Sequence, residues 1–302
     1  MQANVNKSSN VMNKILIPVD FQEQSLLALL QSYNLARRID AEIVLLYVHE
    51  QPGILASLFS KDQHNEILSK IDEKLAELAG KTSLISGLKI TYLIEKGRIY
   101  SKISDVSREI KADYIIMGTH SSETGEEHDL RLGANASKVI RSAQCPVITF
   151  NSKHPYNECR YILLPVDLEK ETSQKIKKCI EIAGIYGAGI KVVTAIWTKN
   201  NPEIKYLLHQ QGEVLTEIIK KAGIDCTFEV VESDDGENTL APAILNYAVQ
   251  QGDIDLILIL TQQEIGIVEY FVGSHAQEFI RLSPIPVMSI IPADTREDSI
   301  FS

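Results

Sequence analysis

A glycine-containing loop at residues 118–136 carries residue types that suit phosphate binding. Its sequence, GTHSSETGEEHDLRLGANA, follows the apolar run DYIIM and leads into a helix-like stretch. Glycine lets backbone approach a phosphate or adopt a positive φ, and a helix that begins after such a loop offers free N–H groups to an anion. The same loop carries four acidic residues: Glu123, Glu126, Glu127 and Asp129. Each would repel a triphosphate by about 1 kcal/mol at ~4 Å in water. The loop is therefore either a modified phosphate loop, assisted by Mg²⁺, or an acidic segment that has lost that role.

The chain repeats itself. KILIPVD, which ends at Asp20, returns as YILLPVD, which ends at Asp167. Three further segments recur in the same order: 41–48 as 188–195, 112–120 as 254–262, and 145–150 as 285–290. The interval, roughly 145 residues, is too long for a solenoid unit and indicates duplication of a whole domain. The sequence predicts one domain at 12–151 and a second at 158–292, with flexible tails at 1–11 and 293–302.

Each copy alternates strand-like and helix-like stretches. In the first copy, apolar runs predict strands at 14–19, 42–48, 89–95, 113–118 and 146–150, and helical spacing predicts helices near 22–39, 66–79, 99–110 and 134–144. The second copy gives the same series, including a long helix near 202–222. Strands that alternate with helices form a parallel sheet covered on both faces. The predicted fold class is therefore α/β, with two doubly wound five-stranded domains in tandem. Such a sheet binds ligands beyond the carboxyl ends of its strands.

Composition and charge exclude several classes of protein. The 302 residues carry a formal net charge of −10, which argues against a nucleic-acid partner and against docking on an anionic membrane. No apolar run approaches the ~18 residues of a membrane span, and the polar start MQANVNKSSNVMNK predicts no signal peptide. The four cysteines are scattered without a C-x-x-C pair, as is typical of a reducing compartment. The sequence thus predicts a cytoplasmic protein.

The series PVD…ADYIIMGTH…CPV resembles the universal stress protein family, as a tandem pair that covers nearly the whole chain. In ATP-binding members of that family, the first-strand Asp and the neighbouring backbone hold adenine and ribose. Their phosphates lie on a loop with the pattern Gly, two residues, Gly, nine residues, then Gly-Ser or Gly-Thr. Other members lack the loop and do not bind ATP. The resemblance also implies pairing of domains through their last strands, here 146–150 and 286–290, as an intramolecular pseudo-dimer or a homodimer.

Neither copy carries the complete loop. In the first copy Gly118 is kept, Ser121 takes the place of the second glycine, and eleven residues rather than nine precede Gly133. The resemblance implies a nucleotide site made of Pro18, Val19, Asp20, Val48, Met117, Gly118, Ser121, Gly133, Ala134 and Asn135. In the second copy Leu260 and Gln263 replace both glycines. There the resemblance implies a vestigial site at Asp167, Gly273 and Ser274. Either aspartate, Asp20 or Asp167, could instead cap the helix that follows it.

Three functional hypotheses follow. The first is a universal stress protein that acts by binding, with ATP and Mg²⁺ as the possible ligand of the first domain and a degenerate second site. The second is a slow Mg-dependent ATPase or nucleotide phosphohydrolase that uses the acidic loop. The third is an interaction scaffold that binds no nucleotide. No catalytic residue and no permanent metal site is predicted, and the apolar stretch at 265–274 is expected to pack against the first copy or a second chain.

Overall fold

Apolar runs in the first half of the chain form strands, and the amphipathic stretches between them form helices. The computed structural model describes residues 12–50, 61–119, 133–151, 158–166, 173–196, 202–233, 240–263, 270–271 and 274–290. The first-half strands are β1 (Asn13–Pro18), β2 (Ala41–His49), β3 (Ile90–Lys96), β4 (Tyr114–Gly118) and β5 (Val147–Phe150). The first-half helices are α1 (Glu23–Arg38), α2 (Lys61–Ser86), α3 (Ile99–Glu109) and α4 (Ala134–Ser142). All of these elements were predicted from the sequence, with differences only at their ends.

The second half repeats this series and adds a short ribbon. Its strands are β6 (Tyr161–Pro165), β7 (Gly189–Ile196), β8 (Cys226–Glu232), β9 (Ile254–Leu260) and β12 (Val287–Ile290). Its helices are α5 (Ser173–Tyr186), α6 (Pro202–Lys221), α7 (Leu240–Gln251) and α8 (Ser274–Leu282). The additional elements are β10 (Gln262–Gln263) and β11 (Tyr270–Phe271), which pair in antiparallel fashion and which the sequence did not predict.

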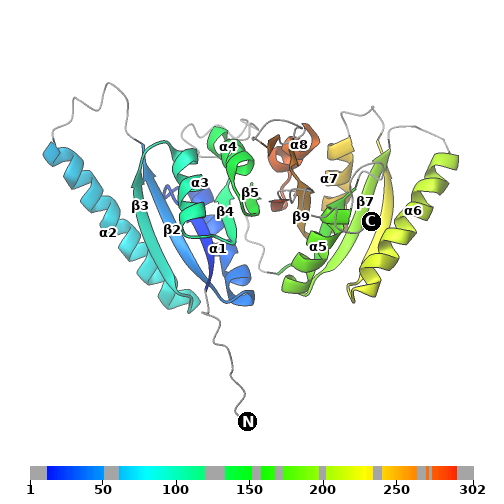
Figure 1. The fold of residues 1–302 in the computed structure, drawn as a ribbon, viewed down its shortest axis with the longest axis horizontal. Helices are drawn as coiled ribbons and strands as arrows, with labels where there is room; N and C mark the ends of the chain where they lie inside the picture. The colour runs from blue at the N-terminus through cyan, green and yellow to red at the C-terminus, as the bar shows by residue number, and fades with distance from the viewer. Residues whose placement is uncertain are drawn as a thin grey trace, which may run out of the picture.

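The two halves share one ten-stranded sheet in the order β3-β2-β1-β4-β5-β12-β9-β6-β7-β8 (Figure 1). Neighbouring strands within each half are parallel, and only β5 and β12, at the seam, are antiparallel. At this seam Ile148 lies opposite Met288, and the Thr149 hydroxyl donates a hydrogen bond to the Val287 carbonyl at 3.2 Å. The expected pairing through the last strands therefore occurs within a single chain.

Helices cover both faces of the sheet, and each face has a core that runs across the seam. The core on the side of α1, α2, α5 and α6 includes Ile15 and Ile17 of the first half and Leu258 of the second. The core on the side of α3, α4, α7 and α8 includes Leu16 of the first half and Ile257 of the second. Because successive strand residues point to opposite faces, each apolar strand contributes to both cores. The two halves are thus joined by packing as well as by backbone hydrogen bonds.

At the edge of the sheet where the parallel strands begin, the two halves make similar contacts that differ by one residue in register. The Asp113 carboxylate accepts a hydrogen bond from the Lys14 N–H at 2.8 Å, and Asp255 accepts one from the Arg160 N–H at 2.8 Å. Each aspartate fastens the fourth strand of its half to the first. Arg160 matches Asn13 in the repeat, so the second half keeps this type of contact one residue earlier, beside the register shift at Tyr161–Ile162.

The helix expected at 134–144 is shorter than predicted. It ends at Ser142, and Ala143 is already extended, with φ −65° and ψ 151°. Pro146 restricts the residue before it to extended conformations, so the chain must leave the helix early enough to start β5. Across the part of the chain that the structure describes, no helix is both long and apolar enough to cross a membrane.

Candidate functional site

The carboxyl ends of β1, β2 and β4 bring together the predicted first-half residues. Pro18 pairs with Leu46 of β2, and Leu16 pairs with Ile115 of β4. Continued along the strands, this register puts Asp20, Val48 and Gly118 at the same edge of the sheet. The edge is a topological switch point, because β2 and β4 lie on opposite sides of β1. Val19 and Met117 are buried just below it, whereas the carboxylate of Asp20 is exposed.

Asp20 already stabilises the start of α1. Its Oδ1 accepts hydrogen bonds from the Gln22 N–H at 2.9 Å and from the Ser25 hydroxyl at 2.7 Å. An aspartate that accepts from the N–H two residues further on forms an Asx-type turn, here directly before the first residue of α1. The N-cap residue of α1 is Gln22, and no side chain caps it, so Asp20 braces the turn that leads into α1 and does not cap the helix itself. A carboxylate has two oxygens with about four acceptor positions, so the exposed group retains capacity for hydroxyl donors.

Phe21, directly after Asp20, has a strained backbone. Its φ is 64°, a left-handed conformation that is a genuine outlier for a bulky residue. The ring is held between Tyr47, at 5.6 Å between ring centroids, and Lys74, whose Nζ lies 5.8 Å from the ring centre. Burial, and then the nearby charge of Asp20, raise the pKa of Tyr47. The sequence analysis missed Phe21, because no residue pattern predicts a positive φ at a phenylalanine.

Gly118 is in close contact with the first turn of α1. A Cβ at this position would lie 2.8 Å from the Cβ of Gln24 and 3.2 Å from the Gln24 backbone. Packing of α1 therefore requires glycine here, independently of any phosphate. The Oε1 atom of Gln24 is buried and accepts no hydrogen bond from the described residues. A buried acceptor of this kind favours the presence of a donor that the described residues do not supply.

Thr119, the residue after β4, holds the end of that strand in place through hydrogen bonds. The sequence analysis did not identify it as a site residue. Its N–H and its hydroxyl both donate to the Phe150 carbonyl, at 3.0 and 3.1 Å, and its own carbonyl accepts from the Gly133 N–H at 2.9 Å. Thr261 makes the same pair of bonds to Ile290, at 2.9 and 3.0 Å. The recurrence of threonine in MGTH and ILTQ was the available signal. In the first half this arrangement puts the start of α4 next to the end of β4.

At this edge, the N-terminus of α4 has backbone donors that no side chain among the described residues caps. Gly133 is its N-cap residue, no side chain caps it, and its first turn contains no acidic residue. Ala134 is exposed and Asn135 is half-buried, so the first turn is accessible. The first N–H groups of a helix lack partners within the helix and carry a partial positive charge. The start of α4 can therefore hold an anionic group.

The second half has a different structure where a phosphate loop would begin. After Leu260 and Thr261 the chain forms β10, in which Gln262 pairs with Phe271 and Gln263 with Tyr270. The partner strand β11 lies against α4 of the first half. The expectation that the apolar stretch at 265–274 meets the first copy is confirmed for its described part, Tyr270–Phe271. Ser274 is the first residue of α8, and Asp167 and Gly273 lie outside the described residues.

The acidic part of the first loop also lies outside the described residues, together with Ser121. The Mg²⁺ role considered for Glu123, Glu126, Glu127 and Asp129 therefore remains a prediction. Among the residues that are described, no group of three or more histidine, cysteine or acidic side chains is arranged to hold a metal ion.

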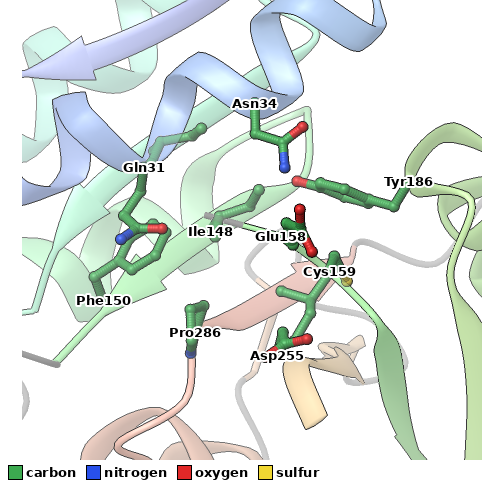
Figure 2. A pocket seen from close by; sticks show the side chains of 11 residues that line it. Gln31, Asn34, Ile148, Phe150, Glu158, Cys159, Tyr186, Asp255 and Pro286 are labelled. Atoms are coloured by element: carbon green, nitrogen blue, oxygen red, sulfur yellow. The ribbon is translucent and has the colours of Figure 1, made fainter. Parts of the chain in front are cut away.

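A small cleft lies between the two halves on the α1 and α5 side of the seam (Figure 2). Gln31 and Asn34 of α1, Tyr186 at the end of α5 and Asp255 of β9 contribute to its lining, and the side chains of Asn34 and Tyr186 point toward each other. Arg38 links the halves beside it, because its Nη1 donates to the Ile185 carbonyl at 3.1 Å. The cleft volume, about 30 Å³, suffices only for water, whereas small-molecule sites usually exceed ~300 Å³. We therefore regard the cleft as part of the seam.

Comparison with known proteins gives the same family for both halves. The model of the universal stress protein family matches residues 12–151 and 159–290. A universal stress protein of Methanocaldococcus jannaschii is 32% identical over 146 residues, covering 48% of this chain and 85% of that protein. One from Mycobacterium bovis is 25% identical over 225 residues, covering 68% of this chain and 73% of that protein. The chain belongs to the universal stress protein family.

Solved structures agree with the fold over both halves. The crystal structure of a universal stress protein from Archaeoglobus fulgidus has a TM-score of 0.71 at 19% identity, covering 93% of this chain and 99% of that chain. A putative universal stress protein from Pseudomonas aeruginosa has a TM-score of 0.63 at 17% identity, covering 93% of this chain and 94% of that chain. At these identities the likeness concerns the fold. The predicted family and fold class are both confirmed.

Proposed function

We propose that this universal stress protein acts by binding an adenine nucleotide in its first half, whereas the second half serves as a structural partner without a nucleotide of its own. The observation that carries the proposal is the contrast between the two fourth-strand ends. In the first half, the N-terminus of α4 lies next to the end of β4 at the switch point of the sheet, and no described side chain caps it. In the second half, the residues that follow the fourth strand instead contribute to the β10–β11 ribbon.

The donors and acceptors at the first-half edge fit an adenine nucleotide. The exposed Asp20 carboxylate would accept from ribose hydroxyls, which are donors that suit its remaining lone pairs. The buried Oε1 of Gln24 would accept from a donor such as an amino group. The N–H groups of Ala134 and Asn135, in the first turn of α4, would hold phosphate oxygens. Mg²⁺ would add charge neutralisation if the acidic loop residues bind it together with the phosphates.

The decisive experiment is a titration of the purified chain with Mg·ATP, after small molecules released by denaturation have been identified by mass spectrometry. Asp20→Asn keeps an acceptor for Gln22 and Ser25 but removes the charge. It should weaken nucleotide binding by about tenfold or more, the usual effect of losing a hydrogen bond to a charged group. Asp167→Asn is the matched control at the repeated position and should leave the affinity unchanged.

Two outcomes would contradict the proposal. If no nucleotide is recovered and none binds at millimolar Mg·ATP, the nucleotide-free scaffold is the better description. Two observations favour this scaffold. The Asp20 carboxylate already forms hydrogen bonds at the start of α1, and close packing against α1 is sufficient to explain the glycine at position 118. If inorganic phosphate is released steadily during the titration, the chain is instead a slow Mg-dependent ATPase.

A further inference from the structure

Helix α6 exposes a row of apolar side chains along its length. The row repeats at intervals of three and four residues, which is the spacing that keeps side chains on one face of a helix. It consists of Ile204, Leu207, Val214 and Ile218, which are 39%, 54%, 59% and 46% exposed, with the exposed Gln211 at its centre. We call these five residues the α6 row. The inward side of the helix is a separate face, where Gly212 packs on Phe228 and Ile219 is fully buried.

The corresponding face of α2 in the first half is charged at four of its five positions, the fifth being Ile67, which matches Ile204 and is 42% exposed. The two helices can be matched through their inward residues, since Ile71, Leu75, Leu78 and Thr82 of α2 have the same spacing as Leu208, Gly212, Leu215 and Ile219 of α6. The four positions of α2 that match Leu207, Gln211, Val214 and Ile218 are then Lys70, Lys74, Glu77 and Lys81. Two of these lysines form ion pairs along the helix, Lys70 with Glu66 and Lys81 with Glu77.

This difference is informative because both helices occupy equivalent places. Each lies at an outer end of the molecule, beside the edge strand of its half (Figure 1). Solvent exposure alone would favour the charged face that α2 has. Exposed apolar rows of this kind, bordered by polar residues, are typical of surfaces that contact another protein.

The charges of α6 are self-complementary in one orientation only. Glu203 lies at its first turn, and Lys220 and Lys221 lie at its last. Its six charged residues, three acidic and three basic, sum to zero, although the whole chain carries −10. Two antiparallel copies would place Glu203 of one near the two lysines of the other, whereas parallel copies would place like charges together. Two copies of this chain repel each other overall because each carries a net charge of −10. The surface around the α6 row carries no net charge and is therefore compatible with contact to a second copy.

We propose that two copies of this chain associate through the α6 row, with the two helices antiparallel and related by a twofold axis near Gln211. Ile204 and Ile218 lie seven residues before and after Gln211, so this axis brings Ile204 of one copy opposite Ile218 of the other. It also brings the two Gln211 amides together, where each can donate to and accept from the other. A polar residue at one core position of a helix pair fixes register and orientation. An isologous contact of this kind closes after two copies.

The contact is expected to be weak. A helix of 20 residues is about 30 Å long, and a single helix pair covers less than the ~800 Å² per partner of a standard interface. Association should therefore depend on concentration. Sedimentation velocity from about 1 μM to several hundred micromolar is expected to show a monomer–dimer equilibrium in that range. A chain that stays monomeric over the whole range would overturn the proposal.

The first variant replaces Leu207 and Val214 with glutamate. Both side chains are more than half exposed, so the fold should be retained, and the dimer should weaken by at least tenfold. The control is Lys70→Glu, which gives α2 the same two glutamates at the matching positions, because Glu77 is already acidic. The control should dimerise as the unaltered chain does. A dimer that survives L207E/V214E would have to form elsewhere on the molecule and would overturn the proposal.

Charge reversal tests the orientation. Lys220→Glu with Lys221→Glu should weaken the dimer, and the further change Glu203→Lys should restore it if the helices are antiparallel. Failure of this rescue would contradict the antiparallel arrangement. The position of the axis is tested by oxidation of Gln211→Cys, which should yield a disulfide-linked dimer, with the matched variant Lys74→Cys as the control. Equal cross-linking of the two variants would overturn the assignment to α6.

Discussion

Gly118 and Gln24 lie so close together that a Cβ on residue 118 would be 2.8 Å from the Cβ of Gln24. Gly118→Ala should therefore destabilise the fold by about 1 to 3 kcal/mol, the usual cost of inserting a carbon into a packed site. Urea unfolding measures this. Gly80→Ala is the control, because nothing lies within 4 Å of that Cβ position in α2. It should stabilise the chain by about 0.5 to 1 kcal/mol through helix propensity.

The contact between Gly118 and Gln24 also limits what a Gly118 variant can show about nucleotide binding. A loss of nucleotide binding in Gly118→Ala would follow from displacement of α1 alone, and α1 carries the partners of Asp20. If Gly118→Ala were as stable as the unaltered chain, the steric explanation of the glycine would be wrong, and a direct role in ligand approach would be favoured.

The seam between β5 and β12 should make the chain unfold as one unit. Met288 is fully buried, lies opposite Ile148 and belongs to a core shared by both halves. Met288→Ala should cost about 2 to 5 kcal/mol and shift a single unfolding transition, as measured by calorimetry. Val249→Ala, at a side chain that is 54% exposed, is the control and should change stability by less than about 0.5 kcal/mol. Two separate transitions, of which only one responds, would show that the halves unfold independently.

Glu42 should contribute to stability at neutral pH but not in acid. Its carboxylate accepts hydrogen bonds from Lys89 at 2.9 Å and Thr91 at 2.7 Å. Burial alone would raise the pKa of Glu42, but the hydrogen bonds from Lys89 and Thr91, together with the charges of Lys89 and Lys14, outweigh it and lower the pKa below its ordinary value. Because the folded-state pKa is the lower one, the stabilisation is present above the unfolded value and is lost as the pH falls through the folded value.

Glu42→Gln should therefore lower stability at pH 7 and reduce the loss of stability between about pH 5 and 3, as measured by urea unfolding at each pH. The matched variant is Glu77→Gln, which removes an exposed i,i+4 partner of Lys81 and should change the profile little. Equal pH profiles for Glu42→Gln and the unaltered chain would contradict this account.

The cysteines should be unreactive in the folded chain. Burial raises the pKa of Cys145 and of Cys159 to about 12 each, and that of Cys226 to about 11. Burial likewise raises the pKa of Cys179. Alkylation requires the thiolate, so the rate for Cys145 or Cys159 at pH 8 should fall about a thousandfold below that of a free cysteine. Mass spectrometry after iodoacetamide treatment should show little labelling of native protein and complete labelling in urea. Rapid native labelling of Cys145 or Cys159, which are half-buried, would contradict this prediction.

Sequence alone determined the family and the overall architecture of this protein. Apolar runs and helical spacing depend on neighbours close in the chain, and they predicted the ten strands of the main sheet. The repeat of KILIPVD as YILLPVD then predicted that both halves share one topology. The family resemblance implied that the two last strands pair, but whether they pair within one chain or between two chains was decided by the structure.

The tertiary structure decided what individual residues at the candidate site do. It alone shows that Gly118 packs against Gln24, that Asp20 forms hydrogen bonds at the start of α1, and that Phe21 has a positive φ. It alone shows that the side chains of the α6 row are exposed, whereas the spacing of its residues in the sequence fits a buried core equally well. The reason is physical: periodicity records which side chains share a face, but only the packing of distant segments decides whether that face meets the core, a ligand or solvent.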